Sequence, residues 1–118
     1  MRQKVLVVLN DPPYGTERSY NGLRLALSVA KRDEADVRVF LIGDAVSCAL
    51  ANQKTPDGYY NLERMIGAVA RRGVEVGCCG SCLDARGITE DLLAKGARPS
   101  SMEELGEWTV WADKVVTF

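Results

Sequence analysis

Hydrophobic residues fall into short continuous runs along this chain, and amphipathic stretches separate them. Val5 to Leu9 is apolar at every position, and the runs over 39–42 and 115–118 are nearly so. Continuous β-branched runs are typical of strands that are covered on both faces. A weaker strand is predicted over 74–78. Since these runs alternate with helical patterns, we expect an α/β domain, a three-layer α/β/α sandwich with a mostly parallel sheet.

Four stretches have the spacing of amphipathic helices. The first is expected to be capped by Thr16 and to run to about Arg32, and the second to be capped by Asn61. A short helix is predicted over 89–95, and the capping box Ser101-x-x-Glu104 opens the last one. The last helix is expected to bury a stripe of five residues: Met102, Leu105, Trp108, Thr109 and Ala112.

The loops and the last strand complete the expected layout. The run that ends at Phe118 is predicted to lie inside the sheet rather than to trail in water. Two segments without helical or strand patterns, 10–15 and 51–60, are predicted loops. In open α/β sheets, binding sites gather at the carboxyl ends of strands. The loop after the first strand and the cysteines that follow the run at 74–78 are both expected there.

Composition narrows the range of functions. With 118 residues, 47% of them hydrophobic and 26% charged, the chain fits a single globular domain over residues 1–118. A net charge of −1 provides no basic field for nucleic acid, and the absence of histidine excludes any mechanism that needs one. The apolar runs are too short to span a membrane, and no signal peptide is recognised. We therefore expect a cytoplasmic protein with reduced thiols.

Three of the four cysteines cluster after the run at 74–78. Cys79 and Cys82 have C-x-x-C spacing, with Cys78 before them and Gly80 and Ser81 between them. The thiolate is the reactive form of cysteine, and nearby cations or backbone N–H groups favour it. Arg86 is the only cation in this stretch, and we expect it to lower the pKa of the Cys79 thiol. The fourth cysteine, Cys48, is expected to be a small core residue.

The residues alone leave four interpretations of this cluster open. A zinc site needs four ligands in tetrahedral array, and adjacent cysteines are awkward ligands. A thioredoxin-like dithiol fits the C-x-x-C spacing, but the motif follows a late strand. A buried structural cluster is the third interpretation, although thiols beside flexible glycines fill a core poorly. The fourth is a nucleophilic thiol that carries sulfur as a persulfide, and neither a metal nor a cofactor is expected with it.

The order and spacing of several short motifs resemble the DsrE/DsrF superfamily, and more closely its YchN-like branch. The matches run almost end to end and are strongest in the last seven residues. They comprise Pro13-Tyr14-Gly15 with Glu17, Leu23-Arg24-Leu25-Ala26, Asp44-Ala45-Val46, Gln53, Gly58-Tyr59-Tyr60-Asn61, the cysteine segment that ends at Arg86-Gly87, Glu104-Leu105 with Trp108, and 112–118.

This resemblance implies an α/β/α fold with a sheet of about five strands and a ring-like homohexamer. Relatives in sulfur relays pass a sulfane sulfur between cysteines, and their reactive cysteine lies seven residues before the arginine of an Arg-Gly pair. That position is Cys79 here, and Cys82 matches a second cysteine of the YchN-like branch. Cys78 has no assigned role. Function must still be argued from the site, because one fold hosts many functions.

The expected function is therefore to carry sulfane sulfur as a persulfide on Cys79, between donor and acceptor proteins with reactive thiols. If Cys82 attacks the inner sulfur instead, a Cys79–Cys82 disulfide forms and sulfide leaves. Arg86 completes the candidate catalytic set. A dithiol redox protein and a non-catalytic oligomeric binding module remain alternatives, and whether the chain is an enzyme stays open. The candidate substrate-binding residues are Pro13, Tyr14, Gly80 and Ser81, although Pro13 and Tyr14 also suit a stiff turn.

Overall fold

The computed structural model describes residues 2–118, and its centre is one five-stranded sheet in the order β4-β3-β2-β1-β5. Every pair of neighbouring strands is parallel, as the apolar runs predicted. The carboxyl ends of all five strands therefore meet at one edge of the sheet. The strands are β1 (Gln3–Leu9), β2 (Ala35–Leu41), β3 (Glu75–Cys79), β4 (Ala97–Ser100) and β5 (Lys114–Thr117).

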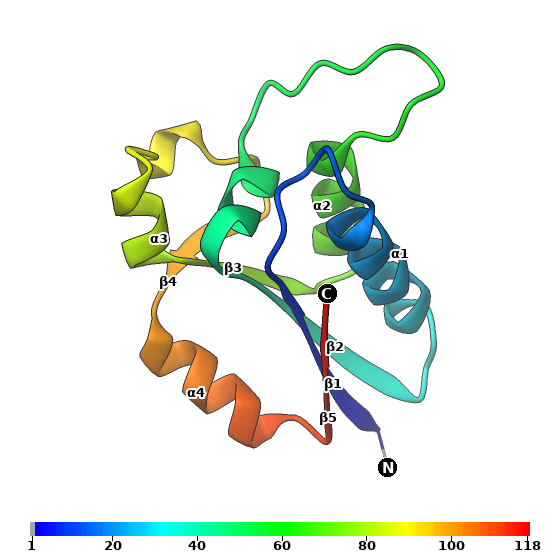
Figure 1. Ribbon diagram of the computed structural model, residues 1–118. Helices are drawn as coiled ribbons and strands as arrows, with labels where there is room; N and C mark the ends of the chain where they lie inside the picture. The colour runs from blue at the N-terminus through cyan, green and yellow to red at the C-terminus, as the bar shows by residue number, and fades with distance from the viewer. Residues whose placement is uncertain (1) are drawn as a thin grey trace.

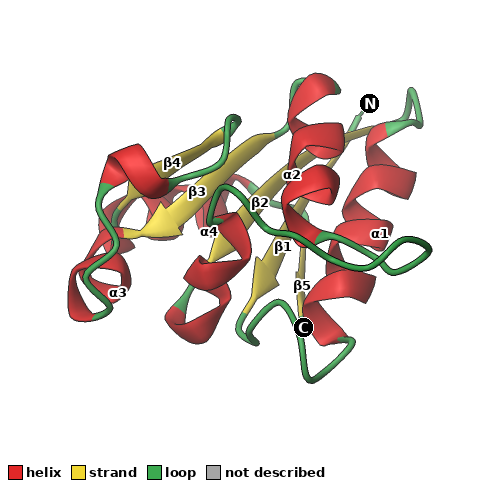
Figure 2. Cartoon of the chain, turned by 90° about the horizontal axis from the view of Figure 1, so that it is seen from above, coloured by secondary structure: helices red, strands yellow, loops and turns green. Residues whose placement is uncertain are grey.

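Helices cover both faces of the sheet, which confirms the predicted three-layer α/β/α sandwich (Figures 1 and 2). Helices α1 (Arg18–Ala30) and α2 (Leu62–Arg71) pack side by side on one face. Helix α4 (Met102–Trp111) covers the other face. The short helix α3 (Gly80–Ala85) and the 3-10 helix η1 (Gly43–Ala49) lie where β3 and β2 end. A second 3-10 helix, η2, spans Glu90–Leu92.

The core forms on both sides of the two central strands. Leu6, Val7 and Val39 are fully buried, as expected for strands that have neighbours on each side. On the α4 face, Phe40 meets Trp108 edge to face with ring centroids 6.0 Å apart. Trp108 is 3% exposed, which confirms its predicted place in the core. Over residues 2–118, no helix combines the length and apolar character needed to span a bilayer.

One of the two edge strands was predicted and the other was missed. β5 pairs with β1, which confirms that the last run belongs to the sheet, and its place is at the edge. Its apolar run is explained by Val116 and Phe118, which are half-buried, whereas Val115 is 45% exposed. The opposite edge strand, β4, was missed because it contains Pro99 and Arg98. Proline is tolerated at a sheet edge, where a ladder hydrogen bond can be absent.

The helix predictions were right in placement and wrong at several ends. Helix α1 begins at Arg18 rather than after Thr16, whose hydroxyl accepts a hydrogen bond from the Arg18 N–H. Asn61 and Ser101 cap α2 and α4 as predicted. The helix expected over 89–95 shortens to the three residues of η2. In α4, Met102 and Thr109 face solvent instead of the core, because its central Trp108 fills most of the contact with the sheet.

Two glycines give a matched test of this packing. A Cβ at Gly96 would lie 2.6 Å from Ala70 Cβ, and its φ of +102° disfavours any side chain. We expect Gly96→Ala to lower the free energy of unfolding by about 1–3 kcal/mol, the usual cost of overpacking. Gly106→Ala has open space on α4 and should raise it by about 0.4–1 kcal/mol. Urea unfolding curves measure both, and equal stability of the two variants would contradict this account.

Candidate functional site: a thiol pair at the end of β3

The C-x-x-C pair lies where β3 passes into α3. Cys79 is the last residue of β3, and Cys82 lies in the first turn of α3. The segment that follows Cys79 forms a short helix. Gly80 permits this, because a Cβ at that position would lie 2.8 Å from the Ser100 carbonyl oxygen at the end of β4. The pair therefore sits at the carboxyl edge of the sheet, as expected for a site in this fold.

Cys79 and Cys82 differ in exposure. The sequence led us to expect the Cys79 sulfur open to water, but Cys79 is only 3% exposed. Cys82 is partly exposed and forms the more accessible half of the pair. The residues between them are also open to solvent, since Ser81 is exposed and Gly80 is half-buried. The structure thus places Gly80 and Ser81 beside the thiols, as their candidate role requires.

The surroundings of Cys79 favour its thiolate. Burial raises the pKa of Cys79, but hydrogen bonds outweigh this and leave the pKa below the ordinary value of 9.0. The contributing donors are the Cys82 thiol, the Ser81 hydroxyl and the backbone N–H groups of residues 81 and 82. The Ser81 oxygen lies 3.4 Å from Cys79 Sγ. Local donors therefore favour the thiolate of Cys79, where the sequence had pointed to Arg86.

The surroundings of Cys82 favour its protonated form. Its pKa is raised first by the hydrogen bond that its thiol donates to Cys79, and then by burial. Two groups oppose that shift and favour a thiolate on Cys82, the Gly43 amide and the Arg86 guanidinium. The Gly43 N–H donates to Cys82 Sγ over 3.2 Å. The pKa values of the two thiols are thus shifted in opposite directions, and each sulfur has its own donors for negative charge.

Arg86 braces the site rather than contacting a thiol directly. Its Nη2 donates to Asp44 Oδ1 at 2.7 Å, and its Nη1 donates to the Cys82 carbonyl at 3.0 Å. The Asp44 carboxylate raises the pKa of Arg86, which stays charged. The ion pair joins the start of η1 to the end of α3 and so holds Gly43 against Cys82. Sequence reasoning missed Gly43 and Asp44 as site residues, although Asp44 belonged to a motif shared with the resembling family.

The remaining two cysteines are buried and inert. Cys78 and Cys48 are both 0% exposed, and burial raises the pKa of each to about 12. Cys78 points to the opposite face of the sheet from Cys79, because successive residues of a strand alternate. The predicted core role of Cys48 is confirmed. Among residues 2–118, no three His, Cys, Asp or Glu side chains converge in a way that could hold a metal ion.

The loop with Pro13 and Tyr14 binds a different part of the molecule. The Tyr14 hydroxyl donates to Gln53 Oε1 and accepts from the Leu62 N–H at 3.2 Å. Its ring stacks on Tyr60 at 5.8 Å between centroids. These contacts tie the loop after β1 to the long segment before α2, which extends from the body in Figure 1. The structure gives Tyr14 no hydrogen bond to the cysteine segment among the described residues.

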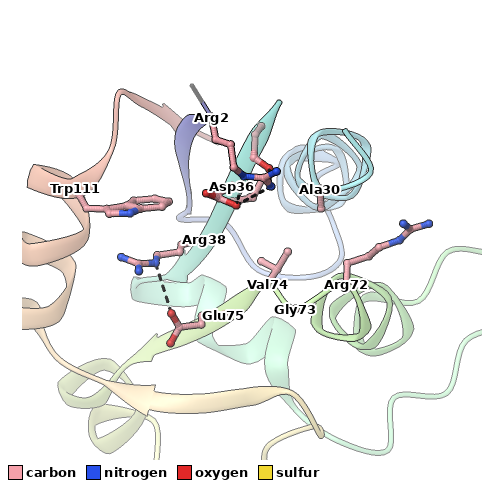
Figure 3. Close-up of a pocket in the computed structure, with 11 residues that line it drawn as sticks. Arg2, Ala30, Asp36, Arg38, Arg72, Gly73, Val74, Glu75 and Trp111 are labelled. Carbon is pink, nitrogen blue, oxygen red and sulfur yellow. Dashed lines mark hydrogen bonds and ion pairs between the residues drawn. The ribbon is translucent and has the colours of Figure 1, made fainter. Parts of the chain in front are cut away.

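A separate pocket of about 260 Å³ lies at the amino-terminal edge of the sheet, away from the thiols (Figure 3). Arg2 pairs there with Asp36, and Arg38 pairs with Glu75 while stacking 4.0 Å from the Trp111 ring centroid. The charges of these residues are thus matched within the protein. The candidate functional site is therefore the opposite, carboxyl edge of the sheet, because the C-x-x-C pair lies there.

These features define an α/β/α domain with an all-parallel sheet and a reactive thiol pair at the carboxyl edge of that sheet. The sequence profile of the DsrE/DsrF-like family matches residues 3–118, so the chain belongs to that family. It is 40% identical to the protein YchN of Escherichia coli (strain K12) over 117 residues, which cover 98% of this chain and 99% of YchN. An uncharacterised protein of Methanocaldococcus jannaschii is 36% identical over 115 residues, 98% of this chain and 99% of that protein.

Solved structures agree with this assignment. The crystal structure of YchN from E. coli aligns with a TM-score of 0.92 at 40% identity, covering 98% of this chain and 99% of that one. A protein of unknown function from Methanobacterium thermoautotrophicum aligns with a TM-score of 0.79 at 13% identity, covering 98% and 99%. The second likeness concerns the fold alone.

The hydroxyl of Ser81 gives a direct test of the charge on Cys79. We expect Ser81→Ala to raise the pKa of Cys79 and to slow its alkylation by iodoacetamide at neutral pH by about 2- to 10-fold, since one hydrogen bond is worth about 0.5–1.5 kcal/mol. The full pH profile should shift to higher pH. Ser28→Ala, at an exposed position of α1, is the control and should leave the profile unchanged. An unshifted pH profile for Ser81→Ala would show that the hydroxyl does not stabilise the Cys79 thiolate.

The two buried thiols should make the protein less stable in alkali. Between pH 9 and about 12 the unfolded chain releases the protons of Cys48 and Cys78, whereas the native state retains them. The free energy of unfolding should therefore fall as pH rises, by up to about 1.4 kcal/mol per pH unit for each thiol. Cys78→Ala should show a shallower slope in urea unfolding across this range. A slope equal to that of the wild type would contradict the burial argument.

Proposed function

We propose that this protein carries sulfane sulfur as a persulfide on Cys79, as a sulfurtransferase or persulfide carrier. The single observation that carries the proposal is the pKa of Cys79, which local hydrogen bonds hold below the ordinary thiol value despite burial. A thiolate is the form that attacks a persulfide, so the lowered pKa favours the reactive form of this cysteine. The low exposure of Cys79 also suits a carrier, because a buried persulfide is shielded from stray thiols.

Membership of the DsrE/DsrF-like family supports the same proposal, since the relatives that this chain resembles include sulfur-relay proteins. The partners proposed are a donor protein with a persulfide and an acceptor protein with a reactive thiol, in the cytoplasm. The proposed assembly is a homo-oligomer, a hexamer by resemblance. Exposed apolar side chains on α4 and β5 support an assembly, because subunit contacts would cover them. They are Met102 at 61%, Val110 at 89% and Val115 at 45% exposure.

Sulfur loading tests the proposal. The reduced protein is incubated with a cysteine desulfurase and cysteine, separated from the donor, alkylated and mapped by fragmentation mass spectrometry. We expect the mass of one added sulfur atom on Cys79, because its surroundings favour the thiolate. The other three cysteines of the wild type should each retain at least ten times less sulfur than Cys79 after the donor is removed. Cys78→Ala is the matched control at the neighbouring position and should load normally.

Two other results would each replace the proposal. A Cys79–Cys82 disulfide that cycles readily without added sulfur would indicate a dithiol redox protein, which the opposite pKa shifts of the two thiols also suit. Slow alkylation of all the native thiols, with no sulfur bound, would indicate a non-catalytic oligomeric binding module.

A further inference from the structure

A difficulty of access follows from the proposed function. The sulfur whose thiolate is favoured belongs to Cys79, which is 3% exposed, so a donor protein reaches it poorly. The neighbouring Cys82 is partly exposed and reaches solvent at the first turn of α3. The two thiols are near enough to shift each other's pKa, in opposite directions. An incoming sulfur therefore meets Cys82 before it can meet Cys79.

Cys82 also has its own groups for stabilising negative charge. The Gly43 N–H points at its sulfur over 3.2 Å. Gly43 is positioned by the neighbouring residue, since Asp44 binds Arg86 at 2.7 Å and Arg86 holds the Cys82 carbonyl at 3.0 Å. The φ of Gly43 is +60°, a backbone conformation that side chains rarely adopt. The start of η1 and the end of α3 are thus held together so that the Gly43 amide faces the Cys82 sulfur. A thiol that is merely buried does not need this arrangement.

We propose that Cys82 is the entry thiol of the site: it takes the sulfane sulfur from the donor and passes it inward to Cys79. This inference rests on the proposed function and assigns Cys82 a catalytic role before Cys79, where the sequence had suggested a role only in releasing sulfide. Gly43, Asp44 and Arg86 are positioning residues that hold the amide and the cation against the Cys82 sulfur.

The two steps balance without an oxidant or reductant. In the first step the proton of Cys82 moves to Cys79, and the Cys82 thiolate attacks the outer sulfur of the donor persulfide. The new bond joins Cys82 Sγ to that sulfur, the sulfur–sulfur bond of the donor breaks, and the donor leaves as a thiolate. The outer sulfur, now on Cys82, keeps its proton.

In the second step Cys79 gives its proton to solvent and its thiolate attacks the outer sulfur on Cys82. The Cys82–sulfur bond breaks, and Cys82 leaves as a thiolate beside the Gly43 N–H and the Arg86 charge. The Cys82 thiolate then takes up a proton from solvent. The result is a persulfide on the buried cysteine and a free thiol on the partly exposed one.

Loading kinetics with glutathione persulfide as the probe test this order. The full-length protein is mixed with the probe, quenched with acid at short times and mapped by fragmentation mass spectrometry. Cys82→Ser should load Cys79 at least ten times more slowly than the wild type and reach the same endpoint. Cys79→Ser should accumulate sulfur on Cys82, because the second step is blocked. Cys78→Ala should follow the wild-type time course. Cys82→Ala should load as slowly as Cys82→Ser, which shows that the effect comes from loss of the thiol and not from the new serine.

Each outcome bears on one claim. A Cys79 loading rate in both Cys82 variants within twofold of the wild type would overturn the entry role and leave Cys79 as the carrier. A lack of sulfur on Cys82 in Cys79→Ser would also overturn the entry role. Absence of sulfur on Cys79 at the endpoint in the wild type would instead overturn the proposed function. Circular dichroism spectra and urea unfolding confirm that the variants are folded before their rates are compared.

Discussion

The close approach of α3 to β4 is the constraint on which the site depends. β3 lies between β2 and β4 and is paired on both sides up to its last residues. The chain must then turn away at once, and Gly80 does so where a Cβ would meet the Ser100 carbonyl oxygen at 2.8 Å. This turn fixes Cys79 at the end of a rigid strand and Cys82 on the first turn of a helix. A thiol pair on a loose loop would have no such defined geometry.

Given that geometry, local dipoles decide the chemistry. Cys79 receives hydrogen bonds from its own segment, whereas Cys82 receives one from Gly43 on a different segment. Arg86 contributes a full positive charge, and Asp44 neutralises much of it. A negative charge can therefore be stabilised on either sulfur, because a hydrogen-bond donor lies beside each of them. This is the property that separates the pair from Cys48 and Cys78, whose surroundings favour only the neutral thiol.

The sequence predicted the central part of the fold and failed at its margins, for physical reasons. Buried strands such as β1 have continuous apolar runs, and the Asn61 and Ser101 caps have local hydrogen-bond patterns that can be read directly. The edge strand β4 buries little, so its residues 97–100 carry no such pattern. The short helix α3 was also missed, because its start is determined by the contact between Gly80 and Ser100, which are distant in sequence.

The same distinction applies to the site. The C-x-x-C spacing and the nearby Arg86 could be read from adjacent residues, and the resemblance to a family pointed to Cys79. No local pattern shows that the Gly43 amide faces Cys82, since the two are 39 residues apart. Exposure is likewise a property of the packed molecule: Cys79 belongs to a strand inside the sheet, and Cys82 to a helix at its rim. A motif thus identifies the candidate thiols, and the tertiary structure determines which of them is the more exposed.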